Sequence, residues 1–281
     1  NATLASIYKL YGSYLIQRQD ETADKILRYA FTIDPFDSEL YRMYSDFEAG
    51  HDNTRSAIRY LQISRVADKM DAAPLQSLIQ IYYKNNSDPG RLLAALKAVL
   101  PMEKDPGIAQ HVNNEVRRLE GLLANKNNWV KTSAEKARKY LFGGKWLAAL
   151  EEYKKLNAFN ASDARLLVEQ GAAYEGLDDK EKALDSYYDA LLVKEDNPEL
   201  NKTLGNFYLS AGNLVLAVLH WKRYLETSPQ EGEYFLIQKR FQFFSQQLRM
   251  KSLEKQIFDL SGEQTRALYK IYRNMKVELG P

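Results

Sequence analysis

The sequence has no cysteine in its 281 residues, which excludes disulfides, thiolate catalysis and zinc sites built on cysteine. It has only three histidines, His51, His111 and His220, and none has a second ligand at metal spacing nearby. Metal sites need convergent donor groups. We therefore expect each histidine to be structural or to lie on the surface, and we expect no metal or other cofactor.

An excess of charge of one sign is also missing, because 39 basic residues offset 37 acidic ones and leave a net charge of +2. So small a charge does not favour nucleic acid as a partner. The chain has no run of about 18 apolar residues, the length that predicts a transmembrane helix. A cysteine-free chain is compatible with the cytoplasm and with a bacterial periplasm, so the compartment stays open.

Motifs that carry catalysis are absent as well. The segment Gly143-Gly144-Lys145 lacks the upstream glycine and the following Ser or Thr of a phosphate-binding loop. The acidic pairs Glu151-Glu152 and Asp178-Asp179 are neighbours in sequence, and neighbours do not face each other on a helix. We therefore predict that the protein is not an enzyme.

What the sequence does contain is a repeat, because three segments of equal length align without a gap between Val130 and Glu231. A helical hairpin needs small residues where its two helices cross and large ones where it fills the space beside a neighbour. The aligned columns alternate in this way: Ala137, Gly171 and Gly205; Tyr140, Tyr174 and Tyr208; Ala149, Ala183 and Ala217; Tyr153, Tyr187 and Trp221.

This pattern resembles the tetratricopeptide repeat family. The resemblance implies an all-α fold, a right-handed α-α superhelix of stacked hairpins, and a function in binding other proteins. Residues 4–37 and 38–71 fit the same template, and a third, irregular hairpin begins near Ala72. We therefore divide the chain into amino-terminal repeats with one unpaired helix at 4–126, three regular units at 130–231, and capping helices at 232–281.

The unpaired helix is predicted near 107–124, where apolar residues recur at steps of three and four. We interpret it as closing the amino-terminal repeats and joining them to the regular array through Asn125-Lys126-Asn127-Asn128. In the alternative interpretation it is the first helix of a unit that lacks its partner.

The last segment departs from the template. A strongly apolar long helix follows Glu231, and Ser261 with Gln264 resembles a capping box that starts a final helix. End units of a solenoid have to cover the last apolar face, so we expect these helices to form a cap.

The resemblance also implies where a partner binds, because the first helix of each unit lines the concave side of such a stack. The lining mixes basic, acidic and small apolar residues, which suits an extended or helical peptide. The predicted groove residues are Lys131, Arg138, Leu141, Arg165, Val168, Glu175, Lys202, Asn206 and Leu209. A solvated inner face that binds nothing is the alternative.

A second interface is predicted on the carboxyl-terminal aromatic residues Phe235, Phe241, Phe243 and Phe244. They cannot all face inward on one helix, since residues 243 and 244 lie about 100° apart. Self-association as a homo-oligomer is therefore an alternative to a non-catalytic scaffold for protein recognition. A third alternative is that the chain is the repeat region of a larger enzyme or secretion complex.

Overall fold

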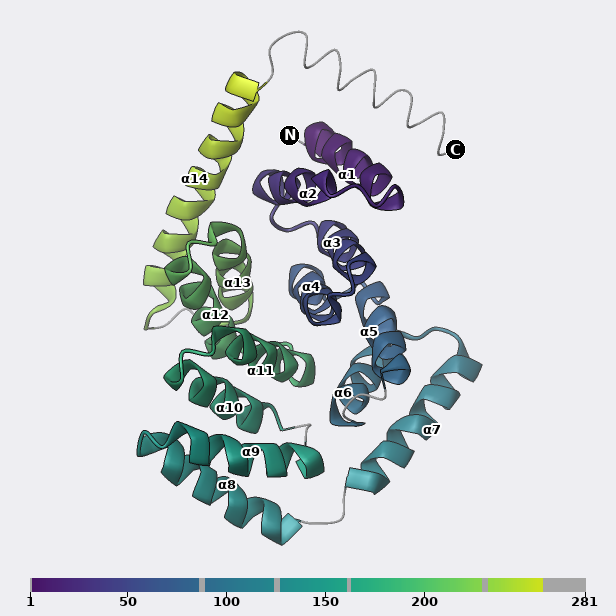
Figure 1. Ribbon diagram of the computed structural model, residues 1–281, viewed down its shortest axis with the longest axis vertical. Helices are drawn as coiled ribbons and strands as arrows, with labels where there is room; N and C mark the ends of the chain where they lie inside the picture. The colour runs from purple at the N-terminus through teal and green to yellow at the C-terminus, as the bar shows by residue number, and fades with distance from the viewer. Residues whose placement is uncertain (1, 86–88, 124–126, 161–162, 229–231, 260–281) are drawn as a thin grey trace. The chain divides into compact units, whose positions relative to one another are not determined.

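The structure is a computed structural model that describes residues 2–85, 89–123, 127–160, 163–228 and 232–259 (Figure 1). Every regular element within these ranges is a helix, so the all-α prediction is confirmed. The elements are α1 (Ala2–Gln17), α2 (Thr22–Ile33), α3 (Ser38–Gly50), α4 (Thr54–Ala67), α5 (Ala73–Lys84), α6 (Pro89–Val99), the 3-10 helix η1 (Leu100–Met102), α7 (Pro106–Leu123), α8 (Asn127–Phe142), α9 (Trp146–Asn160), α10 (Ala164–Gly176), α11 (Lys180–Val193), α12 (Pro198–Ser210), α13 (Leu214–Thr227) and α14 (Tyr234–Asp259).

Small residues allow the helices of a hairpin to approach closely, as the repeat columns predict. A Cβ atom added to Gly171 in α10 would lie 2.3 Å from the ring of Tyr187 in α11. The equivalent Cβ on Gly205 in α12 would lie 2.4 Å from the indole of Trp221 in α13. Each large side chain therefore occupies the space that the glycine one helix earlier leaves open.

The hairpin turns share one backbone conformation. Asp52, Gly144, Asp178 and Gly212 all have positive φ, at 59°, 68°, 58° and 74°, and the last three occupy the same column of successive repeats. The residue after each of them donates its N–H back to a carbonyl near the end of the preceding helix, which closes the turn. Asparagine or aspartate then caps the next helix in several turns, as Asn213 does by accepting from the N–H of Leu216.

Gly176 lies next to a turn, but for a reason other than positive φ. It is the last residue of α10, and the residue with positive φ in that turn is Asp178. A Cβ on Gly176 would lie 2.5 Å from the indole of Trp146 in α9. Glycine at this position thus makes room for a side chain of the preceding hairpin.

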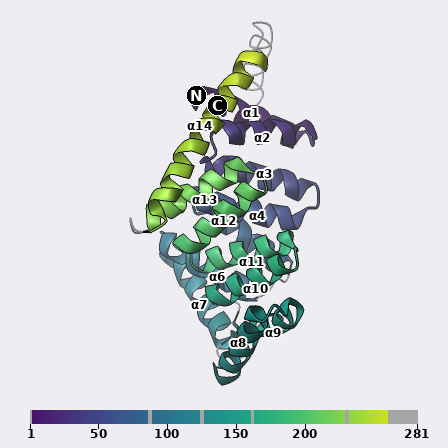
Figure 2. The same cartoon turned by 90° about the vertical axis from the view of Figure 1, so that its left-hand side faces the viewer.

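The chain forms two compact units that cut across the order of the repeats. Unit 1 consists of Asn1–Asp68 and Asn201–Pro281, and unit 2 of Lys69–Leu200. In unit 2, α6 packs against α7, α9 and α11, while α10 packs against α8 and α9. In unit 1, α13 packs against α4, and α14 packs against both α13 and α2 (Figures 1 and 2). The first and last repeats therefore share one core, and α14 packs on the last hairpin.

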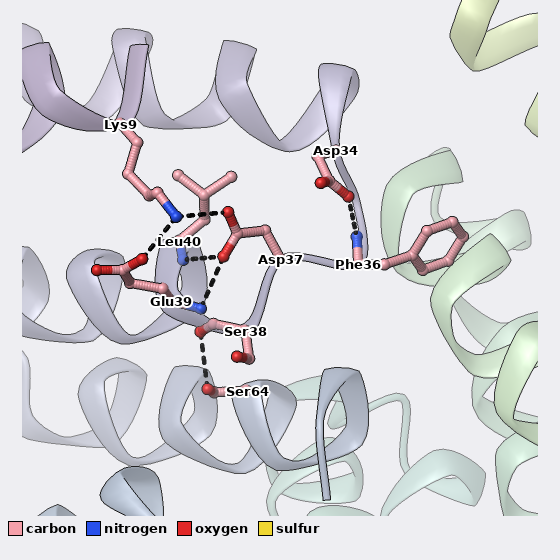
Figure 3. A network of polar contacts seen from close by, with 8 residues as sticks. All are labelled: Lys9, Asp34, Phe36, Asp37, Ser38, Glu39, Leu40 and Ser64. Carbon is pink, nitrogen blue, oxygen red and sulfur yellow. Dashed lines mark hydrogen bonds and ion pairs between the residues drawn. The ribbon is translucent and has the colours of Figure 1, made fainter. Parts of the chain in front are cut away.

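The junction between α2 and α3 in unit 1 is fixed by a polar network (Figure 3). Asp37 caps α3 by accepting from the N–H groups of Glu39 and Leu40, and it also pairs with the Lys9 ammonium at 2.8 Å. Asp34 accepts the N–H of Phe36 at 3.1 Å. This network orients Phe36, whose ring points away from α3 toward the carboxyl-terminal helices of the unit.

The helix predicted near 107–124 is present as α7, which packs on α6 and η1. The predicted connection after it is too long, because Asn127 and Asn128 already belong to α8. Residues 124–126 and the predicted final helix beginning at Ser261 lie outside the described residues.

Candidate protein-binding surfaces

The first helices of two consecutive repeats in unit 2 are joined by an ion pair. Nε of Arg138 in α8 donates to Oε1 of Glu169 in α10 at 2.7 Å, and the hydroxyl of Tyr153 in α9 donates to Oε2 at 3.1 Å. The hydrogen bond to Glu169 raises the pKa of the Arg138 guanidinium. The side chains of Arg138 and Glu169 are 34% and 22% exposed, so solvent and ligands can reach the pair.

The other predicted groove residues of unit 2 differ in exposure. Arg165 and Glu175 are exposed on α10, and Val168 between them is half-buried. Glu175 accepts the hydroxyl of Tyr187 at 2.5 Å. Leu141 is buried in the core, because it follows Ala137 by four residues and so lies only about 40° from it around the helix. The side chain of Lys131 lies outside the described residues.

The remaining groove residues, on α12, belong to unit 1 and are engaged within it. The Lys202 ammonium lies 2.8 Å from a carboxylate oxygen of Glu233, and this hydrogen bond lowers the pKa of Glu233. Asn206 is exposed and accepts from Arg240 of α14 at 3.2 Å, whereas Leu209 is half-buried. Lys202 and Asn206 thus help to hold the cap on α12.

Unit 1 also contains a cleft of about 410 Å³ where α2 and the loop after it meet α13 and α14. Its walls include Phe36, Val218 and Phe241, and the rings of Phe36 and Phe241 lie 6.4 Å apart. The Lys222 ammonium lies 4.4 Å from the centre of the Phe36 ring, close enough for a cation-π contact. This volume is in the range of small-molecule and side-chain pockets.

The polar groups of the cleft lie mainly on α14. Ser245, Gln246 and Arg249 line it from that helix, and Asp34 lines it from the loop after α2. The Ser245 hydroxyl oxygen is buried and has no hydrogen-bond partner among the described residues. A buried hydroxyl without a partner costs free energy, so the site would gain from a ligand that supplies a hydrogen bond.

The four phenylalanines predicted to mediate self-association point in different directions on α14. Phe241 is half-buried in the cleft, and Phe244 is half-buried with its ring 5.8 Å from that of Trp221. Phe235 and Phe243 are more than half exposed. Two of the four therefore stabilise unit 1, and two lie on its surface.

The histidines and acidic residues that the structure describes form no metal site. No group of three or more His, Cys, Asp or Glu residues in the described ranges is arranged to hold a metal ion. His220 is fully buried, with Nδ1 at 3.0 Å from Oδ1 of Asn201, and His51 and His111 are exposed. Among the same residues, no helix combines the length and the apolar character needed to cross a membrane.

A family model described as YpiA-like, C-terminal tetratricopeptide repeats matches residues 167–231. The chain contains tetratricopeptide repeats. The matched segment spans most of α10 and all of α11, α12 and α13, where the glycine and aromatic columns pack together. No curated protein matches the sequence.

Several solved structures are similar in part. Residues 41 to the end of MamA from Desulfovibrio magneticus RS-1 share 20% identity over 68% of this chain and 94% of that one, with a TM-score of 0.33. The TPR domain of P58(IPK) shares 14% identity, and the match covers 97% of this chain and 73% of that one, with a TM-score of 0.41. The TPR2AB domain of yeast Sti1, in a pHSP90 complex, shares 13% identity, and the match covers 90% of this chain and 99% of that one, with a TM-score of 0.36. Similarities at this level assign no function here.

Two features of the binding surfaces were not predicted from the tetratricopeptide register. One is Glu169, whose acidic side chain follows Arg138 by 31 residues, which is nearly one repeat length. The sequence signal for such a pair is a basic residue and an acidic residue on the first helices of consecutive units, about one repeat length apart. The other is the cleft of unit 1, for which no local signal exists, because its walls come from opposite ends of the chain.

Proposed function

We propose that the protein is a non-catalytic scaffold that binds a segment of another protein across the first helices of its tetratricopeptide units. The observation that carries this proposal is the partly exposed Arg138–Glu169 pair, which bridges α8 and α10. It holds a cation and an anion at fixed positions on adjacent first helices. A peptide presents both hydrogen-bond donors and acceptors, so it can engage both groups.

The surroundings of the pair favour an extended or helical peptide over a polyanion. The bond to Glu169 uses only Nε of Arg138, so the terminal amino groups of the guanidinium have no partner among the described residues. Arg165 adds an exposed cation on the same helix as Val168, which offers apolar contact. Glu169 and Glu175 supply negative charge nearby, which disfavours a chain of phosphates.

A selection of random peptides displayed on phage tests this proposal without knowledge of the natural partner. The parent protein should enrich a family of related peptides. The variants Arg138→Ala and Arg165→Ala should weaken binding of those peptides about tenfold or more, the usual loss when one charged contact is removed. Lys154→Ala, at an exposed position on the second helix α9, is the matched control and should bind normally.

Equal binding by the parent, Arg138→Ala and Arg165→Ala proteins would contradict binding at the first helices. Circular dichroism should show unchanged helix content in all variants, because both arginines lie at least partly on the surface.

The cleft of unit 1 is a second candidate position for recognition, favoured by its apolar walls and by the unpartnered Ser245 hydroxyl. It suits a large apolar side chain that carries or adjoins a hydrogen-bonding group. Ser245→Leu would fill part of the cleft and remove the buried hydroxyl, so it should raise stability while blocking the site. If a selected peptide binds Ser245→Leu as tightly as it binds the parent, that peptide does not use the cleft.

A further inference from the structure

A second pocket of unit 1, with a volume of about 150 Å³, lies where the second helices of the first two hairpins meet the start of α13. It shares no lining residue with the cleft described above. A volume of about 150 Å³ holds one six-membered ring, since an engineered cavity of that size binds benzene. The residues that line the pocket include Arg28 and Phe31 of α2, Tyr41 of α3, Tyr60 of α4, and Asn213 and Leu216 at the start of α13.

The floor of this pocket is aromatic and its rim is polar. Phe31 and Tyr41 are buried, whereas Arg28 and Asn213 are exposed. The Phe31 ring lies nearly parallel to that of Tyr41, at 4.6 Å and 17°, and to that of Tyr60, at 6.4 Å and 3°. Parallel rings favour a planar aromatic group that stacks on them in an offset arrangement. The floor therefore suits the ring of an aromatic ligand.

The rim has hydrogen-bond donors that the fold does not use. Arg28 donates through Nε to Asp24 and through Nη2 to the Tyr44 hydroxyl, so its Nη1 has no partner among the described residues. Asn213 caps α13 through Oδ1, and its Nδ2 has no partner in the same part of the chain. Tyr60 contacts its neighbours through its ring, and its hydroxyl has no partner within the described ranges. Burial raises the pKa of Tyr60, so the hydroxyl stays protonated and can donate at neutral pH.

We propose that this pocket binds a small aromatic carboxylic acid, with the ring on the aromatic floor and the carboxylate at the rim. An ionised carboxylate only accepts hydrogen bonds, and Arg28, Tyr60 and Asn213 all offer donors. Its charge belongs at the rim beside Arg28, because the face of an aromatic ring is also negative and repels an anion. A neutral amide would bring donors of its own to a rim that already has donors in excess.

Asp24 limits how much negative charge the rim accepts. It shares the Arg28 guanidinium, with its Oδ1 at 2.8 Å from Nε, and the Tyr44 hydroxyl donates to it as well. The side chains of Arg28 and Asp24 are 58% and 40% exposed, so solvent also screens the pair. The pocket therefore suits a ligand with a single negative charge better than a phosphate with two, and it binds that ligand weakly.

This pocket is separate from the surface proposed above for a protein partner. It lies mainly on second helices of unit 1, whereas Arg138 and Arg165 lie on first helices of unit 2. A ligand in the pocket contacts α2 and α4 from the beginning of the chain and α13 from the second segment of the unit. It would thus stabilise unit 1 where the two segments meet.

Calorimetric titration of the full chain with benzoate, at neutral pH and low salt, tests the proposal. The parent should bind benzoate in a saturable way, and benzamide, which has the same ring but no charge, should bind at least tenfold more weakly. In nuclear magnetic resonance spectra, benzoate should shift the methyl signals of Val215, which also lines the pocket. Absence of saturable binding, equal binding of the two compounds, or binding without the Val215 shift would overturn the proposal.

Three substitutions test the roles of the rim groups. Arg28→Gln should weaken benzoate binding about tenfold or more, because it removes a charged hydrogen bond. Tyr60→Phe removes one oxygen and leaves the stacked rings, so it should keep the fold and weaken binding several-fold. Asp24→Asn should strengthen binding several-fold, since a neutral amide competes less for the guanidinium. Parent-like affinity in both Arg28→Gln and Tyr60→Phe would overturn the proposal.

Matched controls separate this pocket from general effects of charge and from the protein-binding surface. Arg18→Gln removes an exposed arginine of unit 1 outside the pocket, and Tyr83→Phe removes the hydroxyl of a 51% exposed tyrosine of unit 2. Both should bind benzoate like the parent, and so should Arg138→Ala. A loss in Arg18→Gln equal to that in Arg28→Gln would show that benzoate responds only to net charge, which contradicts a specific site.

Discussion

The ring of Tyr187 occupies the space that a side chain on Gly171 would need, since an added Cβ would lie 2.3 Å from Cε1 of the ring. This contact joins the two helices of one tetratricopeptide hairpin. Neither residue can change size without the other moving, because the tyrosine is buried and part of a packed core.

Gly171→Ala should therefore destabilise the protein by about 1–3 kcal/mol, the usual cost of overpacking a core. Urea denaturation followed by circular dichroism measures this loss. Gly50→Ala is the matched control, because a Cβ on Gly50 would meet nothing within 4 Å. At that helical position alanine should leave stability unchanged or raise it by up to about 1 kcal/mol. If the two substitutions had equal effects, the close contact would not stabilise the hairpin.

The shared turn conformation predicts opposite effects at two equivalent positions. Asp178 and Gly212 lie one repeat length apart, and both have positive φ. Asp178→Gly should raise stability by several tenths of a kcal/mol, since glycine adopts this conformation without a Cβ penalty. Gly212→Ala should lower stability by about 1 kcal/mol for the same reason. Thermal unfolding of both variants and the parent measures the two stability changes. Changes of the same sign would contradict this account.

Burial lowers the pKa of His220 from 6.5 to about 3. The folded state keeps this imidazole neutral, whereas the unfolded state protonates it near its ordinary pKa. The stabilising effect is thus complete above pH 6.5 and is lost as the pH falls toward 3. At pH 5 the expected loss is about 2 kcal/mol from this group alone.

The difference in unfolding free energy between the parent and His220→Gln isolates the effect of His220 from that of the carboxylates. That difference should shrink as the pH falls from 7 to 5. Nuclear magnetic resonance of the ring provides an independent measurement if the variant does not fold. A His220 signal that titrates near pH 6 in the folded protein would show that the ring is accessible to protons.

Breaking the Arg138–Glu169 pair should lower the stability of the protein and strengthen its binding of a peptide. Glu169→Gln should cost about 0.2–1 kcal/mol of stability, because a partly exposed pair contributes little. It should also strengthen binding of a peptide carboxylate to Arg138, since a neutral amide competes less well for the guanidinium. Calorimetric titration with a peptide selected on the parent measures the affinity, and a decrease in affinity would mean that the peptide contacts Glu169 directly.

The tetratricopeptide columns could be predicted from the sequence because they record contacts within one hairpin. Gly171 and Tyr187 are separated by less than one repeat length, so their sizes are coupled inside a single repeat. The same holds for Gly205 and Trp221. The turn glycines Gly144 and Gly212 each answer to the backbone of their own hairpin turn, where φ is positive. Even the long apolar helix after the repeats was predictable from its composition.

The sequence by itself thus determined the helices, their pairing into hairpins and the small and large residues at each crossing. Which repeats share a core was decided only by the tertiary structure, which brings Phe36 and Phe241 together in unit 1 and turns Phe243 outward. The physical reason is that helical periodicity reports which face of a helix is apolar. It does not report which distant helix covers that face, because many apolar faces are equally able to bury one another.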